Sequence, residues 1–302
     1  MALRERLAEL AARRVYIGTS SWKYPGWLGD IYTKDRYLTR SKVSEQKFDA
    51  ECLAEYTETF PTVGGDFTFY TFHKAEFWAG LFAQVPPSFQ FGLKVPEAIT
   101  VKRWPTHARY GVRKGQDNDS FLDAELFRAL FTDVLSPYRA QVGPLMFEFG
   151  SLAKKDFATP ADFAAALDPF LAALQPGFKY GIEIRNSEYL VPDYLDVLRR
   201  HNVAHVFNSW TRMPPLDAQA MREDLWTADF AVCRALLRPG RDYETAVDTF
   251  EPYTHIQQEY PEARAGLRAM IDRGPEIRNG VYVYVNNRLE GNAPGTIRSV
   301  IA

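Results

Sequence analysis

Six charged side chains at the ends of apolar runs are the residues in this sequence best suited to chemistry. Three are acids and three are bases: Asp66, Glu148, Glu183, Lys94, Arg185 and Arg234. Two carboxyl groups held close together have their pKa values pushed apart, so that one can donate a proton and the other can accept one. Basic side chains beside them can hold a phosphate or a carboxylate. These residue types predict acid–base or hydrolytic chemistry on an anionic substrate, phosphorylated or nucleotide-like.

The elements that must position these side chains form a regular alternation. Strand candidates, rich in β-branched and aromatic residues, cover 15–20, 63–70, 89–95, 142–148, 179–185, 204–208, 230–237 and 281–286, and helical periodicity covers 42–59, 121–135, 161–174, 191–201 and 255–273. Eight units of about 36 residues are typical of a closed parallel barrel. We therefore expect an α/β fold, a TIM-type (β/α)8 barrel over 15–302, as a single domain after a short N-terminal helical extension, 1–14.

Alternation along these strands directs the six charges into the barrel, near the strand ends where such barrels carry their active sites. Glu148 shares its direction with Met146, and Glu183 shares its direction with Gly181. The last strand is ambiguous, and we favour inward directions for Tyr282, Tyr284 and Asn286. Burying ions costs several kcal/mol each even when they are paired, so a ligand site explains the six charges better than barrel filling. A self-neutralised salt-bridge network is the alternative.

Roles follow from this placement. We expect Glu148 and Glu183 to act as acid and base, with Asp66 as a third catalytic carboxylate. The expected substrate-binding residues are Ser20, Trp22, Tyr70, Lys94, Arg185, Arg234, Asn286 and Asn287. The carboxylates can instead pair with the bases and stay ionised, and the two asparagines can instead brace the last turn.

A basic segment over 101–116 follows the third strand and contains no acid. Within it, Arg103, Trp104, His107 and Arg109 combine cations with an aromatic surface, the combination that contacts single-stranded nucleic acids or other anions. The segment therefore supports an alternative function, a non-catalytic nucleic-acid or anion-binding module. A solvated basic loop is the plainer interpretation.

Composition narrows the remaining classes. The 36 Lys and Arg against 38 Asp and Glu give a net charge of −2. A protein that binds nucleic acids non-specifically has an excess of positive charge, so this class is not indicated. We expect a cytoplasmic protein, since no apolar run is long enough to cross a membrane. Cys52 and Cys233 lie far apart, without metal-ligand spacing. No cofactor is predicted; Mg²⁺ or Mn²⁺ held by Asp66, Glu148 and Glu183 is a weaker alternative, and the oligomeric state is left open.

Several segments at the expected strand ends resemble one family. They are 17–27 (Ile-Gly-Thr-Ser-Ser-Trp-Lys-Tyr-Pro-Gly-Trp), 67–70, 92–96, 183–185, 283–287 and 290–294. Together they resemble the YecE-like proteins, domain of unknown function 72, over about residues 15–300. The resemblance implies a TIM-type barrel and leaves the reaction unknown, because a fold does not determine an activity.

The chain also departs from that family's pattern. Residues 63–70 read Val-Gly-Gly-Asp-Phe-Thr-Phe-Tyr where the family usually has Val-Glu-Ile-Asn-Ser-Thr-Phe-Tyr, and Val101 and Leu236 stand where it usually has histidines. These departures allow two interpretations. The chain belongs to a branch with another substrate, or to one without catalysis.

Overall fold

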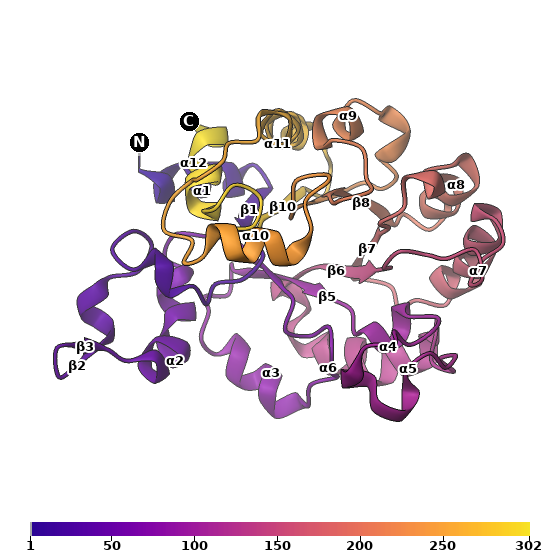
Figure 1. Ribbon diagram of the computed structural model, residues 1–302, viewed down its shortest axis with the longest axis horizontal. Helices are drawn as coiled ribbons and strands as arrows, with labels where there is room; N and C mark the ends of the chain where they lie inside the picture. The colour runs from indigo at the N-terminus through magenta and orange to yellow at the C-terminus, as the bar shows by residue number, and fades with distance from the viewer. Residues whose placement is uncertain (1) are drawn as a thin grey trace.

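Eight parallel strands close into one barrel in the computed structural model, which describes residues 2–302 (Figure 1). The strands are β1 (Val15–Thr19), β4 (Thr62–Gly65), β5 (Gln90–Lys94), β6 (Val142–Glu148), β7 (Lys179–Glu183), β8 (Ala204–Ser209), β9 (Ala231–Ala235) and β10 (Val281–Val285). Each strand pairs in parallel with its neighbours, and β1 closes the ring between β10 and β4. The expected TIM-type (β/α)8 architecture is confirmed.

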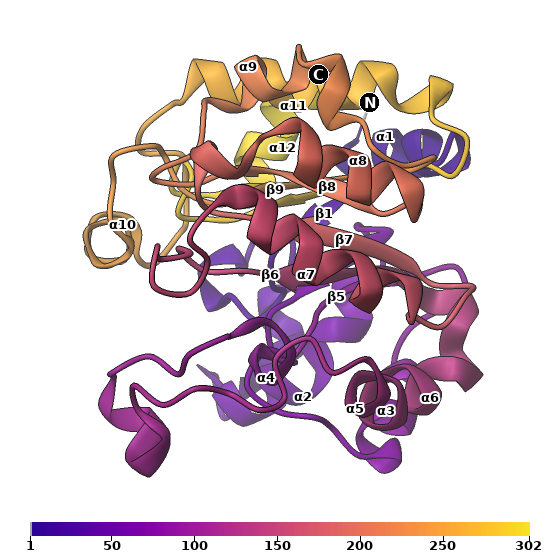
Figure 2. The same cartoon turned by 90° about the vertical axis from the view of Figure 1, so that its right-hand side faces the viewer.

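Helices surround the barrel (Figure 2). They are α1 (Leu3–Ala12), α2 (Glu45–Tyr56), α3 (Ala75–Phe82), α4 (Glu97–Thr100), α5 (Ala124–Phe127), α6 (Asp133–Leu135), α7 (Pro160–Ala172), α8 (Pro192–Arg200), α9 (Leu216–Ala220), α10 (Tyr243–Phe250), α11 (Pro261–Arg273) and α12 (Ala293–Ile301). A small hairpin of β2 (Leu38–Thr39) and β3 (Lys42–Val43) lies outside the barrel. No helix within residues 2–302 has both the length and the apolar character that a membrane crossing requires.

Local sequence signals explain where several helices begin. Thr159 and Asp162 form a reciprocal capping box around Pro160, the first residue of α7. The Ser44 side chain accepts a hydrogen bond from the Lys47 amide and starts α2. Such caps satisfy amide groups that have no partner inside a helix, and they fix the point at which the chain turns away from the barrel.

Four of the differences between the observed and the predicted elements change the local structure or move a helix start by three residues or more. The second barrel strand ends at Gly65, because residues 67–70 form a turn in which the Phe69 amide donates to Asp66 O. The helix expected over 42–59 begins at Glu45 after the short hairpin, and the one expected over 255–273 begins at Pro261. The helix expected over 121–135 contains a π-helical turn, Arg128–Thr132, between α5 and α6.

The barrel interior confirms the predicted alternation. The part of the interior below the charged strand ends is filled by an apolar cluster: Tyr16, Met146, Ala204, Val206, Ala228, Phe230, Val232, Tyr282 and Tyr284. Tyr284 fits because β4 and β5 present glycines to it: a Cβ on Gly92 would lie 2.2 Å from the Tyr284 hydroxyl, and one on Gly64 would lie 3.1 Å from its ring. Tyr282 and Tyr284 therefore point inward as favoured, and they form the floor beneath the charged residues.

The first helix lies at the other end of the barrel. Arg4 and Ala8 of α1 line a surface pocket together with Tyr16, Pro61 and Phe89, residues at the starts of β1, β4 and β5. Figure 2 shows α1 on the side opposite α10. The barrel thus has one end covered by α1 and the other surrounded by the loops that follow the strands.

Candidate functional site

The six predicted charges gather at the C-terminal end of the barrel. Glu148 and Glu183 are the last residues of β6 and β7 and stand side by side in register. Lys94 ends β5, and Asp66 follows β4 directly. Arg234 is the last residue but one of β9, and the carboxyl ends of parallel strands meet at one rim. Arg185, two residues beyond β7, completes the group.

Arg234 is the centre of an ion-pair network. Its Nη2 donates to Asp66 Oδ1 at 2.8 Å, and its Nη1 donates to Glu148 Oε2 at 2.8 Å and to Glu183 Oε2. Lys94 Nζ lies 2.9 Å from the same Glu148 oxygen and 3.9 Å from Asp66 Oδ1. One cation thus connects the ends of four strands, which fixes the arrangement of the carboxylates.

Arg185 adds a second guanidinium to this network. Its Nη2 lies 2.6 Å from Glu148 Oε2, while its Nε and Nη2 both donate to Glu183 Oε1 at 3.1 Å. Burial by itself would raise the pKa of Glu148, but Arg185, Lys94 and Arg234 outweigh burial and hold that pKa well below its usual range. Glu148 is therefore ionised at neutral pH and is no proton donor there.

The three carboxylates differ in their access to solvent. The Glu183 side chain is fully buried, that of Glu148 is 8% exposed, and that of Asp66 is 43% exposed. A group that exchanges protons with a substrate must be reachable by it. Asp66 is the most accessible carboxylate of the network, and Glu183 is enclosed by its contacts with the two arginines.

A pocket of about 510 Å³ opens above this network. Five basic side chains and two carboxylates line it, together with aromatic and polar residues: Ser21, Tyr24, Asp66, Phe69, Tyr70, Lys94, Arg109, Glu148, Arg185, Trp210, Arg234, Leu236, Tyr243, Asn286 and Arg288. We call it the charged pocket. Ligand sites of this volume are common, and an excess of positive side chains favours an anionic occupant.

Aromatic rings support four of the five cations. Lys94 Nζ lies 3.6 Å from the centre of the Phe69 ring, and Arg185 Cζ lies 3.7 Å from that of Trp210. Arg109 and Arg288 lie over Tyr70 and Tyr243, at 4.5 and 4.4 Å. Stacking on a ring face holds a guanidinium plane in place without using its hydrogen-bond donors.

Arg109 and Arg288 have no carboxylate partner within residues 2–302. Lys94, Arg185 and Arg234, by contrast, all pair with acids of the network. The two rim arginines are therefore the cations whose donors are open to a ligand.

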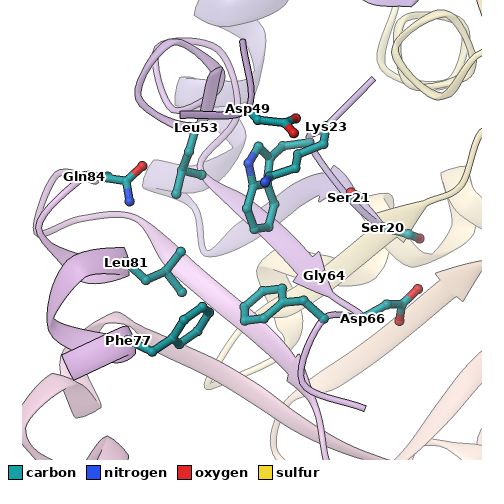
Figure 3. A pocket seen from close by; sticks show the side chains of 12 residues that line it. Ser20, Ser21, Lys23, Asp49, Leu53, Gly64, Asp66, Phe77, Leu81 and Gln84 are labelled. Atoms are coloured by element: carbon teal, nitrogen blue, oxygen red, sulfur yellow. The ribbon is translucent and has the colours of Figure 1, made fainter. Parts of the chain in front are cut away.

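The structure sorts the predicted substrate-binding residues into three groups. Lys94, Arg185, Arg234, Asn286 and Tyr70 line the charged pocket, although Tyr70 lies in the turn after β4 and not on a strand. Ser20 and Trp22 line a neighbouring, largely apolar pocket (Figure 3). Asn287 lines neither: it is 1% exposed and its Oδ1 accepts the Ala293 amide at 2.8 Å, so it braces the start of α12.

The basic segment after β5 contributes one residue to the charged pocket, Arg109. Arg103 instead pairs with Asp117 at 2.8 Å, and His107 Nδ1 accepts the backbone amide of Arg109 at 3.2 Å. Trp104 is buried at 7% exposure. In Figure 2 this segment and α10 project from the same side of the barrel, so the expectation that it lies beside the lumen charges is met for Arg109 only.

The hypothesis of a Mg²⁺ or Mn²⁺ site needs correction. Asp66, Glu148 and Glu183 each direct oxygens at a lysine or an arginine, and residues 2–302 contain no cluster of three acidic, histidine or cysteine side chains arranged for a metal. The space between these carboxylates is taken by cationic side chains, which do for their charge what a metal ion would do.

Seven residues of the charged pocket were not among the predicted site residues, and Trp210, Tyr243 and Arg288 are three of them. Trp210 and Arg288 lie one and three residues beyond β8 and β10, so their position after a strand is a signal that could have found them. Tyr243 begins α10, a helix without a predicted counterpart. Leu236, at one of the missing family histidines, also lines this pocket, whereas Val101 does not.

Comparisons with known proteins agree with the fold. Two solved structures cover 95% of this chain: a DUF72 family protein from Thermotoga maritima MSB8 (19% identity, 97% of that chain, TM-score 0.62) and one from Enterococcus faecalis V583 (15%, 94%, 0.61). At these identities the likeness shows the fold alone. No curated protein matches the chain. Residues 16–302 match the family described as "Protein of unknown function DUF72", and the chain therefore belongs to the DUF72 family.

Proposed function

We propose that the protein is an enzyme that binds a small organic anion in the charged pocket and performs acid–base or hydrolytic chemistry on it. One observation carries the proposal: five basic side chains, four of them stacked on aromatic rings, converge with two carboxylates at the C-terminal end of a TIM-type barrel. Three of these cations pair with acids of the network, so the remaining positive charge of Arg109 and Arg288 favours an anionic ligand.

In this proposal the rim arginines bind the anion first. Arg109 and Arg288 present donors without a carboxylate partner in residues 2–302, and their stacking on Tyr70 and Tyr243 sets the direction of those donors. A bidentate contact to phosphate or carboxylate then places the substrate above Arg234. Asn286 lines the same pocket and can orient the bound group.

Proton transfer is assigned to Asp66. Its contacts with Arg234 and Lys94 both use Oδ1, which leaves Oδ2 to accept a proton. In a hydrolysis, Asp66 would take a proton from water, and the water oxygen would bond to the substrate's phosphoryl or acyl centre. The leaving group would depart with its bonding electrons and take that proton from Asp66, which regenerates the carboxylate. Glu148 and Glu183 hold the cations in this scheme, because one is kept ionised and the other is out of reach.

The test is binding and turnover with a panel of small phosphate and carboxylate esters. Arg109→Gln and Arg288→Gln should each weaken binding about tenfold or more, since a charge-assisted hydrogen bond is lost. Arg113→Gln is the matched control: Arg113 stacks on Trp104 at 4.3 Å in the same segment, outside the charged pocket. Asp66→Asn should keep binding and lose turnover. Equal losses in all three arginine variants would refute the assignment.

Nucleic-acid binding predicts a different result. A single-stranded oligonucleotide would bind with an affinity that falls steeply with salt, with a slope of about −0.7 per phosphate contacted. That affinity would depend on Arg103 and Arg109 together. Two cations of this segment already have partners within the protein: Arg103 pairs with Asp117, and Lys102 lies 3.8 Å from the centre of the Phe157 ring. Their pairing favours the small-anion proposal.

A further inference from the structure

A second pocket, of about 330 Å³, lies beside the charged pocket. Its lining comes from the loop after β1, from α2, from the end of β4 and from α3: Ser20, Ser21, Trp22, Lys23, Asp49, Leu53, Gly64, Asp66, Phe67, Phe77, Leu81 and Gln84. Figure 3 shows Ser20 and Asp66 on one side of it, with Leu53, Phe77, Leu81 and Gln84 on the other. We call it the apolar pocket, since Trp22, Leu53, Phe67, Phe77 and Leu81 form most of its wall.

Three aromatic rings build this wall in contact with one another. Trp22 and Phe67 meet edge to face at 5.6 Å between ring centres, and Phe67 and Phe77 lie 5.8 Å apart. Phe67 reaches this position because residue 65 is glycine: a Cβ on Gly65 would lie 2.6 Å from the Phe67 ring. The α3 helix supplies Phe77 and Leu81 one turn apart on a single face. Such walls favour an aromatic occupant.

Two residues that line the apolar pocket carry a buried polar group without a hydrogen-bond partner in the part of the chain that the structure describes. Ser20 Oγ and Trp22 Nε1 are buried and have no hydrogen-bond partner within residues 2–302. The indoles of Trp27 and Trp78 are also unpartnered, but neither lines this pocket or the charged one. Buried polar groups normally have partners, so these two donors fit a ligand that carries at least one acceptor.

The two pockets share part of their walls. Ser21 and Asp66 line both, so the two pockets adjoin at the carboxylate assigned to proton transfer. We propose that the substrate is an aromatic anion, with its phosphate or carboxylate in the charged pocket and its ring in the apolar pocket. This inference rests on the proposed function and adds the class of substrate.

Exposure supports this substrate class as well. Phe77 is 39% exposed and is one of few large apolar side chains with that much contact with solvent. His73 stacks on the Phe77 ring at 3.8 Å between ring centres, and a ligand ring placed against the exposed surface of Phe77 would remove apolar area from water. Lys23 and Asp49, two exposed residues of the apolar pocket, carry opposite charges, so their electrostatic effects at its entrance largely cancel. The charge that selects the anion is thus confined to the neighbouring pocket.

The experiment compares three probes by calorimetric titration of the full chain: inorganic phosphate, 1-naphthyl phosphate and 1-naphthol. Naphthyl phosphate should bind at least about tenfold more tightly than phosphate, because the ring buries apolar surface. Phe77→Ala should reduce that advantage severalfold and leave the phosphate affinity unchanged. Leu130→Ala is the control, an apolar residue of similar exposure, 42%, outside both pockets.

Each outcome separates the two claims. If phosphate and naphthyl phosphate bind equally well, the aromatic subsite is refuted and the anion site stands. If Phe77→Ala and Leu130→Ala have the same effect on naphthyl phosphate, the ring does not enter the apolar pocket and the inference is also refuted. If neither anion binds, the proposed function fails, and the inference that rests on it fails too.

Discussion

Glu183 shows how a buried charge can matter without touching a substrate. Its side chain is fully buried and accepts hydrogen bonds from Arg185 and Arg234. Removing one partner of a buried ion pair leaves the other charge without compensation, at a cost of about 3–5 kcal/mol. Glu183→Gln should therefore lower the free energy of unfolding by about that amount, as measured by urea denaturation.

The matched variant for this prediction is Asp66→Asn. Asp66 contacts Arg234 as well, but its side chain is 43% exposed and water can replace the lost contact. Exposed pairs contribute about 1 kcal/mol or less, so Asp66→Asn should change stability far less than Glu183→Gln. Equal losses in the two variants would mean that burial does not set the energy of this network.

The sequence predicted all six network charges, and the period of two along a strand accounts for the four that lie on strands, Lys94, Glu148, Glu183 and Arg234. Asp66 and Arg185 lie just beyond their strands. Once the strands were placed, Glu148 shared the direction of Met146, and the outward packing expected of Ile182 and Ile184 sent Glu183 inward. No such period applies to loops. Arg288 and Trp210 take their positions from the path of the chain after β10 and β8, which depends on tertiary packing and not on local alternation.

The same contrast holds at the scale of the elements. Alternating strands and helices predicted the barrel. When a helix connects two neighbouring strands of a sheet, the second strand runs parallel to the first. Boundaries were less certain, because they depend on single capping or turn residues. The strand expected to run to Tyr70 ends at Gly65, where Gly64 and Gly65 make room for Tyr284 and Phe67.

A buried histidine of β8, His205, contacts α8 and makes the stability of the fold depend on pH. His205 is 1% exposed; its Nδ1 lies 3.2 Å from the Tyr194 hydroxyl, and its Nε2 has no partner within residues 2–302. Burial, aided by Arg222, lowers the pKa of His205 from 6.5 to about 3. The folded protein therefore keeps this ring neutral at pH values where the unfolded chain protonates it.

The free energy of unfolding should therefore decrease as the pH is lowered. Below about pH 6.5 the unfolded state gains a proton that the folded state does not bind until about pH 3, so the free energy of unfolding decreases by about 1.4 kcal/mol per pH unit. His205→Phe should remove this contribution between pH 6.5 and 5 in urea titrations. If the free energy of unfolding of the variant changes with pH as steeply as that of the original protein, the buried histidine is not the source of the pH dependence.

At the scale of the whole molecule, the two ends of the barrel have different tasks. The C-terminal end carries the charged and apolar pockets, whereas α1 covers the N-terminal end with Leu7 and Leu10 buried. The apolar cluster of Tyr282, Tyr284 and Met146 fills the interior between them. In barrels of this type the N-terminal end contributes stability and the C-terminal end contributes function.

This separation predicts that damage to α1 will weaken the fold and spare the site. Leu7 is fully buried, so Leu7→Ala should lower the free energy of unfolding by about 2–5 kcal/mol through lost burial and the cavity left behind. At a temperature where the variant is folded, its affinity for 1-naphthyl phosphate should equal that of the original chain. A weaker affinity in the folded variant would mean that the two ends are coupled through the barrel interior, and the apolar floor under Arg234 would then be the structure that transmits the change.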